Sequence, residues 1–226
     1  MTERARKDDT QCQADTSVTP RLAEVQTVFL DRDGVINRKP AEGEYVLSWA
    51  EFEFLPGVRD AVCLVTRAGL RVIVVTNQRG VARGLLRESE VQTIHRRMTA
   101  ALAKSGGTID GVYYCPHNDG ECDCRKPNVG LFRKAQRDFP AIDFAKSVVI
   151  GDSLADIGAG NSIGSAAILI EDDPNAAVAA IRKAQQTGLR IDAVAPSLLV
   201  AFRHLLAALG QEARAQDSAP IDLGPV

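Results

Sequence analysis

The sequence predicts an α/β fold in which a doubly wound parallel sheet carries helices on both faces. Two observations predict it. Short apolar runs alternate along the chain with segments whose apolar residues recur at helical spacing. The apolar runs are also continuous rather than alternating with polar residues, which is typical of parallel strands buried on both faces. A β-α-β-α order of this kind indicates a Rossmann-like sheet, which binds ligands at the carboxyl ends of its strands.

The elements follow from these patterns. We expect strands at Val25–Leu30, Arg71–Thr76, Gly111–Cys115, Ser147–Gly151 and Ala166–Ile170. Apolar stripes at helical spacing begin at Val58, Val91, Phe132 and Leu198. The 226 residues suffice for one sizeable domain, which we place at residues 21–210. We expect residues 1–20 to be a disordered extension and residues 211–226 a flexible tail, because both stretches are polar or poor in large apolar residues.

Composition narrows the classes of partner. Hydrophobic residues make up 45% of the chain and charged residues 25%, as in soluble globular proteins. A net charge of −2 does not favour a nucleic acid. No apolar run approaches the roughly 20 residues that span a bilayer, and Met1–Thr19 lacks the apolar stretch of a secretory signal. We therefore expect a cytoplasmic protein with a small-molecule substrate and no membrane partner. We also expect a monomer, because no unexplained apolar stripe is evident.

Carboxylates follow two of the expected strands. Asp31-Arg32-Asp33-Gly34 comes directly after Val28-Phe29-Leu30, and Asp152 and Asp156 follow Ser147–Gly151. Like charges so close together are costly unless a cation compensates them, and oxygen ligands suit Mg²⁺. A carboxylate can also attack phosphorus and form an aspartyl-phosphate. Each aspartate alone is equally compatible with a strand end or a helix cap, but their joint placement favours a site.

Two further motifs carry groups that suit a phosphoryl ligand. Thr76 ends an expected strand, where its hydroxyl can hold phosphoryl oxygens, although Thr-Asn is also an ordinary turn signal. In Arg125-Lys126-Pro127, a fixed lysine would stabilise the charge that spreads over the equatorial oxygens in phosphoryl transfer. Arg125 could bind a second anionic group. The alternative for this motif is a solvated basic pair.

A cysteine cluster precedes that basic motif. Cys115, His117, Cys122 and Cys124 lie within ten residues, and three thiolates with one imidazole complete a tetrahedral Zn²⁺ site without an open position. Such a closed site is structural, and it would hold the neighbouring Lys126 in place. The alternative is three unpaired thiols near a surface loop.

The remaining aromatic and histidine residues receive plainer interpretations. His95 and His204 lie in helical patterns, and we interpret them as surface or packing residues rather than ligands. Phe52 lies in the loop after the first strand and is expected to pack. Tyr45 and Trp49 in the same loop either pack or line the mouth of a pocket.

Taken together, four stretches resemble the four motifs of the haloacid dehalogenase superfamily of phosphohydrolases, in the order of that family. They are Phe29–Asn37, Val75–Gln78, Arg125-Lys126-Pro127 and Gly151–Asp156. The resemblance covers roughly Thr27 to Ile170. Segments Asp33–Gly57 and Gln78–Cys115 are too short for a folded cap domain, so we expect an open site without a large cap.

The cysteine loop resembles one small cap-less branch of the superfamily. That branch contains the heptose-bisphosphate 7-phosphatases and the histidinol-phosphate phosphatases. Segments Thr76–Gly84 and Glu44–Gly57 resemble the heptose enzymes, whereas the short gap between His117 and Cys122 resembles the histidinol enzymes. The resemblance thus implies hydrolysis of the 7-phosphate of D-glycero-D-manno-heptose 1,7-bisphosphate, in carbohydrate metabolism, with histidinol phosphate as the alternative substrate. A non-catalytic binding protein is the remote alternative.

The resemblance also implies roles for single residues. Asp31 would attack phosphorus, Asp33 would act as acid and then base, and Thr76 and Lys126 would stabilise the phosphoryl group. Magnesium would be held by the Asp31 carboxylate, the Asp33 backbone carbonyl and Asp152. Zinc would be structural. The residues implied in substrate binding are Asn77, Gln78, Arg79, Arg125 and Ser153.

Overall fold

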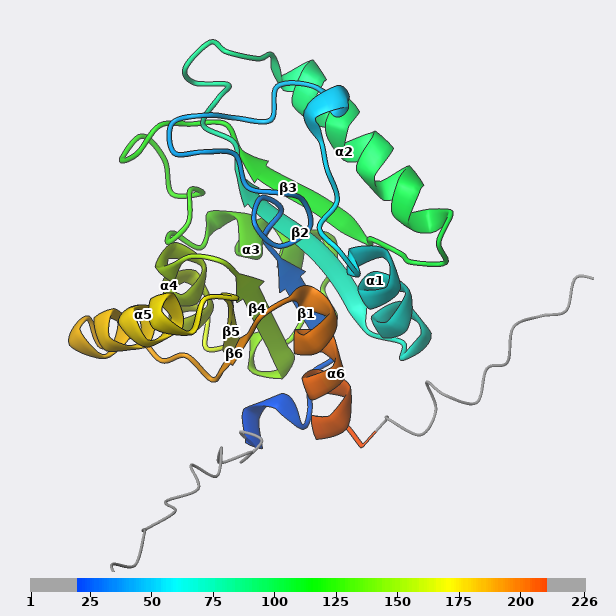
Figure 1. Cartoon of the computed structure of the whole chain (residues 1–226), viewed down its shortest axis with the longest axis vertical. Coiled ribbons are helices and arrows are strands. Elements are labelled where there is room, and N and C mark those ends of the chain that lie inside the picture. The colour runs from blue at the N-terminus through cyan, green and yellow to red at the C-terminus, as the bar shows by residue number, and fades with distance from the viewer. Residues whose placement is uncertain (1–19, 211–226) are drawn as a thin grey trace, which may run out of the picture.

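The computed structural model describes residues 20–210, so the extension and the tail expected at the two ends lie outside the described residues (Figure 1). One sheet of six parallel strands runs in the order β3-β2-β1-β4-β5-β6. The strands are β1 (Thr27–Leu30), β2 (Arg71–Asn77), β3 (Gly111–Cys115), β4 (Ser147–Gly151), β5 (Ala166–Ile170) and β6 (Ala193–Ala195). The chain order reverses at β1, which confirms the expected doubly wound sheet.

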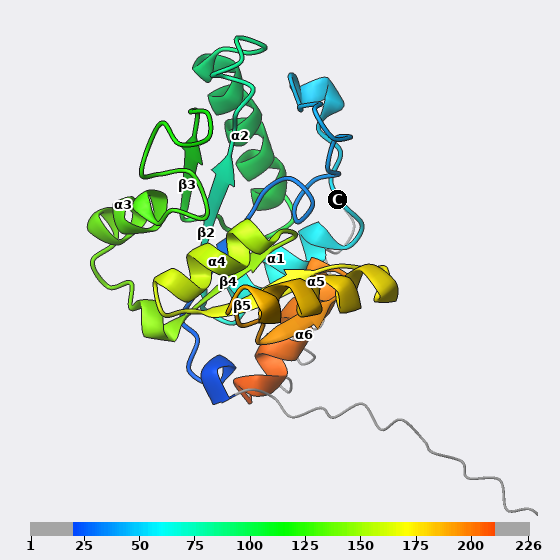
Figure 2. The same cartoon turned by 90° about the vertical axis from the view of Figure 1, so that its left-hand side faces the viewer.

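Helices cover both faces of this sheet (Figures 1 and 2). Helices α1 (Val58–Arg67), α2 (Glu88–Ala103) and α6 (Leu198–Ala208) share one apolar core with the sheet. Helices α3 (Gly130–Asp138), α4 (Leu154–Ser162) and α5 (Pro174–Gln186) lie against the other face. Successive strand residues point to opposite faces. Leu30 therefore joins the first core, while Phe29 packs edge-on against Phe132 of α3, with ring centroids 5.0 Å apart.

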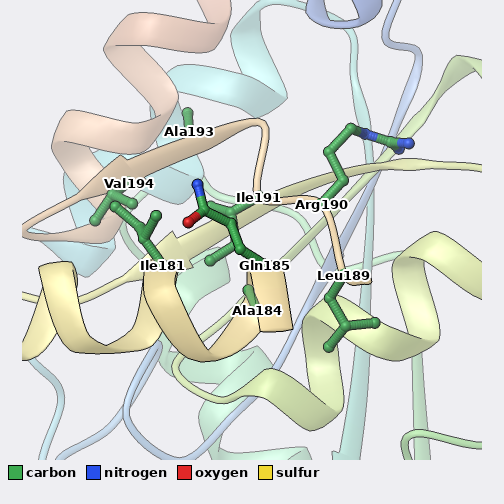
Figure 3. Close-up of a pocket in the computed structure, with 8 residues that line it drawn as sticks. All are labelled: Ile181, Ala184, Gln185, Leu189, Arg190, Ile191, Ala193 and Val194. Carbon is green, nitrogen blue, oxygen red and sulfur yellow. The ribbon is translucent and has the colours of Figure 1, made fainter. Parts of the chain in front are cut away.

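Strand β6 and helix α5 were not among the expected elements. β6 has only three residues, and α5 has a single fully buried residue, Ala184, so neither shows a strong apolar pattern. The start of α5 does carry a sequence signal, because the Asp173 side chain accepts a hydrogen bond from the Asn175 amide and Pro174 occupies the first turn. A groove lies between α5 and β6, with Ile181 and Val194 on its walls (Figure 3).

The strand register brings the expected motifs to one edge of the sheet. Leu30 pairs with Val74 of β2 and with Ile150 of β4, so the residues that follow each strand emerge side by side. The loop that begins at Cys115 emerges next to Asn77 at the end of β2. Among residues 20–210, no segment folds as a large cap over this edge, and no helix is both long and apolar enough to cross a bilayer.

The loop after β1 is stabilised by an aromatic cluster. Trp49 stacks on Phe52 with ring centroids 5.0 Å apart, and Phe52 meets Phe54 edge-on at 5.1 Å. Phe52 is buried, which confirms that it packs. Trp49 belongs to the same cluster, whereas the Tyr45 ring lies under the guanidinium of Arg83.

Candidate active site

Three carboxylates meet where β1 and β4 end. Asp31 follows β1, Asp152 follows β4, and Asp156 lies in the first turn of α4. One oxygen from each lies within 4.8 Å of the others. Burial raises the pKa of Asp31 to about 7, helped by the charges of Asp156 and Asp152 and opposed by the nearby lysine Lys126. Burial also raises the pKa of Asp152. The cluster therefore holds excess negative charge that a cation would relieve.

Lys126 supplies part of that positive charge from within the chain. Its Nζ lies 3.0 Å from Asp31 Oδ1, 2.5 Å from Asp156 Oδ1 and 2.6 Å from the Val75 carbonyl oxygen. The side chain is only 2% exposed. Burial opposes the charged form, but the two carboxylates raise the pKa of Lys126. The ammonium is thus fixed beside Asp31.

Asp156 holds this lysine and is itself held by Ser153. The Ser153 hydroxyl donates to Asp156 Oδ2 at 2.5 Å. The structure gives Ser153 this internal contact, and the substrate contact expected of it stays a prediction. The sequence motif contained Asp156, but its pairing with Lys126 depends on the first turn of α4, which brings its carboxylate back over the end of β4.

The Asp33 carboxylate is held by a different set of residues from those around Lys126. Nε and Nη2 of Arg32 donate to it at 2.9–3.2 Å, Asn37 Nδ2 donates at 2.8 Å, and Gln78 Nε2 donates at 2.9 Å. Burial opposes ionisation, but the Arg32 charge and the amide donors lower the pKa of Asp33. Gln78 also donates to Thr76 Oγ1 at 3.0 Å and so links the ends of β1 and β2. The Asp33 side chain is therefore held as a carboxylate.

Gly34 lets the first loop approach Asp152. Its φ is +85°, in the left-handed region that glycine tolerates. A Cβ at this position would lie 2.0 Å from Asp152 Oδ2, so no larger residue fits without moving that carboxylate. Lys39 reaches the same oxygen, with Nζ 2.7 Å away. Gly34, Lys39 and Asp152 also line a cavity of about 600 Å³. The sequence interpretation did not single out Lys39.

The remaining expected substrate ligands divide into two groups. Asn77 clamps the loop of Lys126, accepting from its amide at 3.1 Å and donating to its carbonyl at 3.2 Å. Arg79 and Arg125 instead converge on Asp119: Arg79 Nη1 lies 3.0 Å from Asp119 Oδ2, and Arg125 Nε also bonds this carboxylate. Two guanidinium groups, one from the loop after β2 and one from the cysteine loop, therefore meet at Asp119, where an anion could bind.

The cysteine loop brings its four donors together. Cys122 Sγ lies 3.5 Å from Cys115 Sγ and 3.1 Å from Cys124 Sγ, while His117 Nδ1 lies 3.6 Å from Cys115 Sγ and 3.4 Å from Cys124 Sγ. Zinc bond lengths predict tetrahedral edges of about 3.8 Å between sulfurs and about 3.6 Å between nitrogen and sulfur. The donor set and its spacing therefore fit Zn²⁺.

Three comparisons with known proteins agree with this geometry. The HAD-hydrolase-like family model matches residues 123–201. The D-glycero-alpha-D-manno-heptose-1,7-bisphosphate 7-phosphatase of Mycobacterium bovis is 41% identical over 151 residues, which cover 66% of this chain and 79% of the relative. The corresponding beta-heptose enzyme of an Escherichia coli O6:H1 strain is 43% identical over 143 residues, covering 60% of this chain and 73% of the relative.

A solved structure matches over nearly its whole length. The D,D-heptose 1,7-bisphosphate phosphatase from B. bronchiseptica, complexed with magnesium and phosphate, aligns with a TM-score of 0.70 and 34% identity. The alignment covers 81% of this chain and 99% of that one. This chain belongs to the haloacid dehalogenase superfamily of phosphatases. The expected family, fold and enzyme class are thereby confirmed.

The donors of this HAD phosphatase also fit magnesium. Carboxylate oxygens are the hard ligands that Mg²⁺ prefers, and the three carboxylates Asp31, Asp152 and Asp156 outnumber the two lysines that contact them, Lys126 and Lys39. The Asp33 side chain lies outside this group of three. A magnesium ligand from Asp33 would therefore come from its backbone carbonyl, as the family resemblance implies.

Proposed function

We propose that this HAD phosphatase removes the 7-phosphate of D-glycero-D-manno-heptose 1,7-bisphosphate through an aspartyl-phosphate at Asp31. One observation carries the proposal: a buried lysine, Lys126, lies 3.0 Å from Asp31 in a carboxylate cluster suited to Mg²⁺, in a chain 41% identical to an enzyme named for this reaction. Magnesium, when bound, would neutralise phosphoryl charge and orient the phosphate for attack. Its ligands would be the Asp31 and Asp152 carboxylates and the Asp33 carbonyl.

In the first half-reaction, an Asp31 carboxylate oxygen attacks phosphorus and the bond between phosphorus and the sugar oxygen breaks. The departing oxygen takes a proton from Asp33, which must first have taken one up because the donors around it favour its ionised form, and the dephosphorylated sugar leaves as an alcohol. Lys126 and the Thr76 hydroxyl stabilise the charge on the transferring phosphoryl group. Arg32, Asn37 and Gln78 fix the Asp33 side chain, so that its proton is delivered from one position.

In the second half-reaction, Asp33 takes a proton from water, the resulting hydroxide attacks phosphorus, and the bond to Asp31 breaks. Inorganic phosphate leaves and Asp31 is restored. The donors around Asp33 lower its pKa and favour the ionised form, which is the form that this step requires. The base is therefore ready as soon as the sugar has left.

The rest of the substrate would bind outside the carboxylate cluster. We assign the 1-phosphate to Arg79 and Arg125, which lie together on Asp119 and could exchange that carboxylate for a phosphate. Asn77, Gln78 and Ser153 would line the path between the two phosphates. A structural Zn²⁺ on Cys115, His117, Cys122 and Cys124 would hold the loop that carries Arg125. Reduced thiols suit a cytoplasmic enzyme, and we propose that it acts as a monomer.

A substrate panel tests the proposal. Release of inorganic phosphate would be measured with Mg²⁺ on both anomers of the heptose bisphosphate, on histidinol phosphate and on p-nitrophenyl phosphate, with Asp31→Asn as the blank. We expect kcat/KM at least about tenfold higher for a heptose bisphosphate than for histidinol phosphate. Both anomers are needed because the relatives named above act on different ones. A preference for histidinol phosphate would overturn the substrate assignment, and no release from any ester would overturn the reaction.

A further inference from the structure

Arg32 is a buried cation between the two aspartates of the first motif, and its side chain has two bonding edges. It is among the largest fully buried side chains of the described residues, at 1% exposure. One edge, Nε and Nη2, donates to the Asp33 carboxylate. The remaining nitrogen, Nη1, lies 3.1 Å from Nε2 of His95, a residue 63 positions later in the chain. His95 lies on α2 and is 5% exposed.

The contact between Arg32 and His95 determines where the imidazole proton lies. A guanidinium has only donors, so His95 Nε2 must accept, and the proton of the neutral ring must be on Nδ1. Burial, together with the Arg32 charge, lowers the pKa of His95 to about 3, although Asp33 opposes this. His95 therefore remains a neutral acceptor at the pH at which enzymes of this kind work.

The imidazole is itself held in place by β3. Its ring meets Tyr114 edge-on, with centroids 5.5 Å apart and planes at 61°. The Tyr114 hydroxyl donates to Glu88 Oε2 at 2.9 Å and accepts from Gln92 Nε2 at 3.2 Å. Glu88 and Gln92 lie on α2 with His95. Helix and strand thus fix the ring from two directions.

We propose that His95 is a positioning residue for the acid–base carboxylate: it fixes the buried guanidinium of Arg32, whose other edge holds Asp33. The inference rests on the proposed function, because it requires that Asp33 moves the proton. Without the acceptor on α2, a buried Nη1–H group would have no partner, and the guanidinium would turn to find one. The Asp33 carboxylate would then lose its fixed orientation, while the groups that bind substrate would stay in place.

Substitutions at His95 separate this role from simple packing. The amide oxygen of glutamine lies as many bonds from Cβ as Nε2 of histidine, whereas that of asparagine is one bond shorter. His95→Gln therefore keeps the acceptor, His95→Asn keeps a polar group that cannot reach Arg32, and His95→Leu removes the acceptor while filling the space. His204→Gln, an exposed histidine on α6, is the matched control.

Steady-state kinetics on the best substrate of the panel is the first readout. We expect kcat of His95→Leu and His95→Asn to fall about tenfold or more, with KM within about twofold, since general acid–base catalysis contributes about 10²–10⁴-fold. His95→Gln should stay within about threefold of the wild type, and His204→Gln should not differ. Equal kcat in the Gln and Asn variants, or a change in KM alone, would overturn the inference. If His95→Leu does not fold, the Gln and Asn pair still decides.

The imidazole tautomer is a second readout, independent of turnover. ¹⁵N NMR of the wild-type protein at pH 7 should show His95 with an unprotonated Nε2 and a protonated Nδ1. A protonated Nε2 would overturn the inference whatever the kinetics. If the wild type hydrolyses no phosphate ester, the proposed function fails while the tautomer still reports the contact. If the wild type is active but all His95 variants match it, only the positioning role fails.

Discussion

The two groups of side chains that could hold a metal ion in this protein are built on different supports. Asp31, Asp152 and Asp156 stand at strand ends and on the first turn of α4, where the sheet fixes their backbones. The cysteine loop takes only Cys115 from a strand, and its other donors come from the stretch before α3 that contains no helix or strand. The carboxylate cluster has an internal cation in Lys126, whereas the four donors of the loop contact one another.

This difference indicates what each group needs from its ion. A group on rigid elements with its own counter-charge keeps its shape when the metal leaves, so the metal serves chemistry. A group on an irregular loop has little else to order it, so we expect a metal there to serve folding. Burial raises the pKa of Cys115 and Cys124, so these two thiols favour the protonated form when no metal is bound.

Removing the nucleophile is the strongest test of the carboxylate cluster. In Asp31→Asn, kcat should fall by about 10³-fold or more, because a carboxamide does not form the covalent intermediate. The fold should be retained, since Lys126 keeps Asp156 as a partner and one of the crowded charges is gone. Phosphate release and a thermal melt check both points. Turnover near the wild-type rate would show that the covalent mechanism is wrong, and an unfolded variant would show that the cluster depends on Asp31 for its shape.

A methyl group at Gly34 tests how rigid the carboxylate cluster is. Gly34→Ala should weaken Mg²⁺ binding about tenfold or more, because the new Cβ would meet Asp152 Oδ2 at 2.0 Å and the sheet leaves that carboxylate little room to move. The positive φ adds strain of about 1 kcal/mol. Isothermal titration with Mg²⁺ measures the first effect. Gly43→Ala is the control, since its φ is +86° but no atom lies within 4 Å of its Cβ. Equal Mg²⁺ affinity in both variants would contradict the argument.

How much of this site the sequence alone predicted depends on how far apart in the chain the contacting residues lie. Asp31, Thr76 and Asp152 were found because each ends or directly follows an apolar run, and parallel strands gather their carboxyl ends at one edge. Lys126 was found from the basic motif beside the cysteine cluster. The cysteine loop was found because its donors are close in the chain. The core strands were also recognised from a local pattern, because their apolar runs are continuous in the sequence.

The features that the sequence did not reveal depend on contacts across the fold. The contact between Arg32 and His95 joins residues 63 positions apart and depends on the rotation of α2 about its axis. No local pattern records that rotation, so His95 was interpreted only as a surface or packing residue. Its burial confirms packing, while the bond to Arg32 adds a role that the helical pattern alone did not show. Helix α5 was missed because its buried side consists mainly of alanine.

Removing one zinc ligand tests the other half of the comparison. Cys122→Ser should lower the zinc content of the purified protein and the melting temperature by several degrees, because the loop would lose the ion that orders it. kcat/KM should fall more for the heptose bisphosphate than for p-nitrophenyl phosphate, since Arg125 is on the loop while the carboxylate cluster stays intact. Metal analysis and the two assays check this, with Cys63→Ser as a control outside the loop. Equal losses on both substrates would mean that the two groups do not act separately.

The smallest expected effect is in the pH dependence of stability, to which His95 and Asp31 contribute with opposite signs. His95 has a pKa of about 3 in the folded protein, whereas its ordinary value is 6.5. Below pH 6.5 the unfolded chain therefore binds a proton that the folded chain does not, and stability decreases as the pH is lowered. Asp31 has a pKa of about 7 against an ordinary 3.8, so between these values the folded chain binds the extra proton, and stability rises as pH falls.

Comparing the wild type with His95→Gln isolates the contribution of His95 to the pH dependence of stability. Asp31 is present in both the wild type and His95→Gln, so its contribution cancels. Between pH 7.5 and pH 5 in the absence of Mg²⁺, the wild type should lose about 2 kcal/mol of unfolding free energy relative to the variant. Urea unfolding at the two pH values measures this. A difference that does not change with pH would mean that His95 takes up its proton in the folded state as readily as in the unfolded one. His95 would then not be a neutral, fixed acceptor for the Arg32 guanidinium.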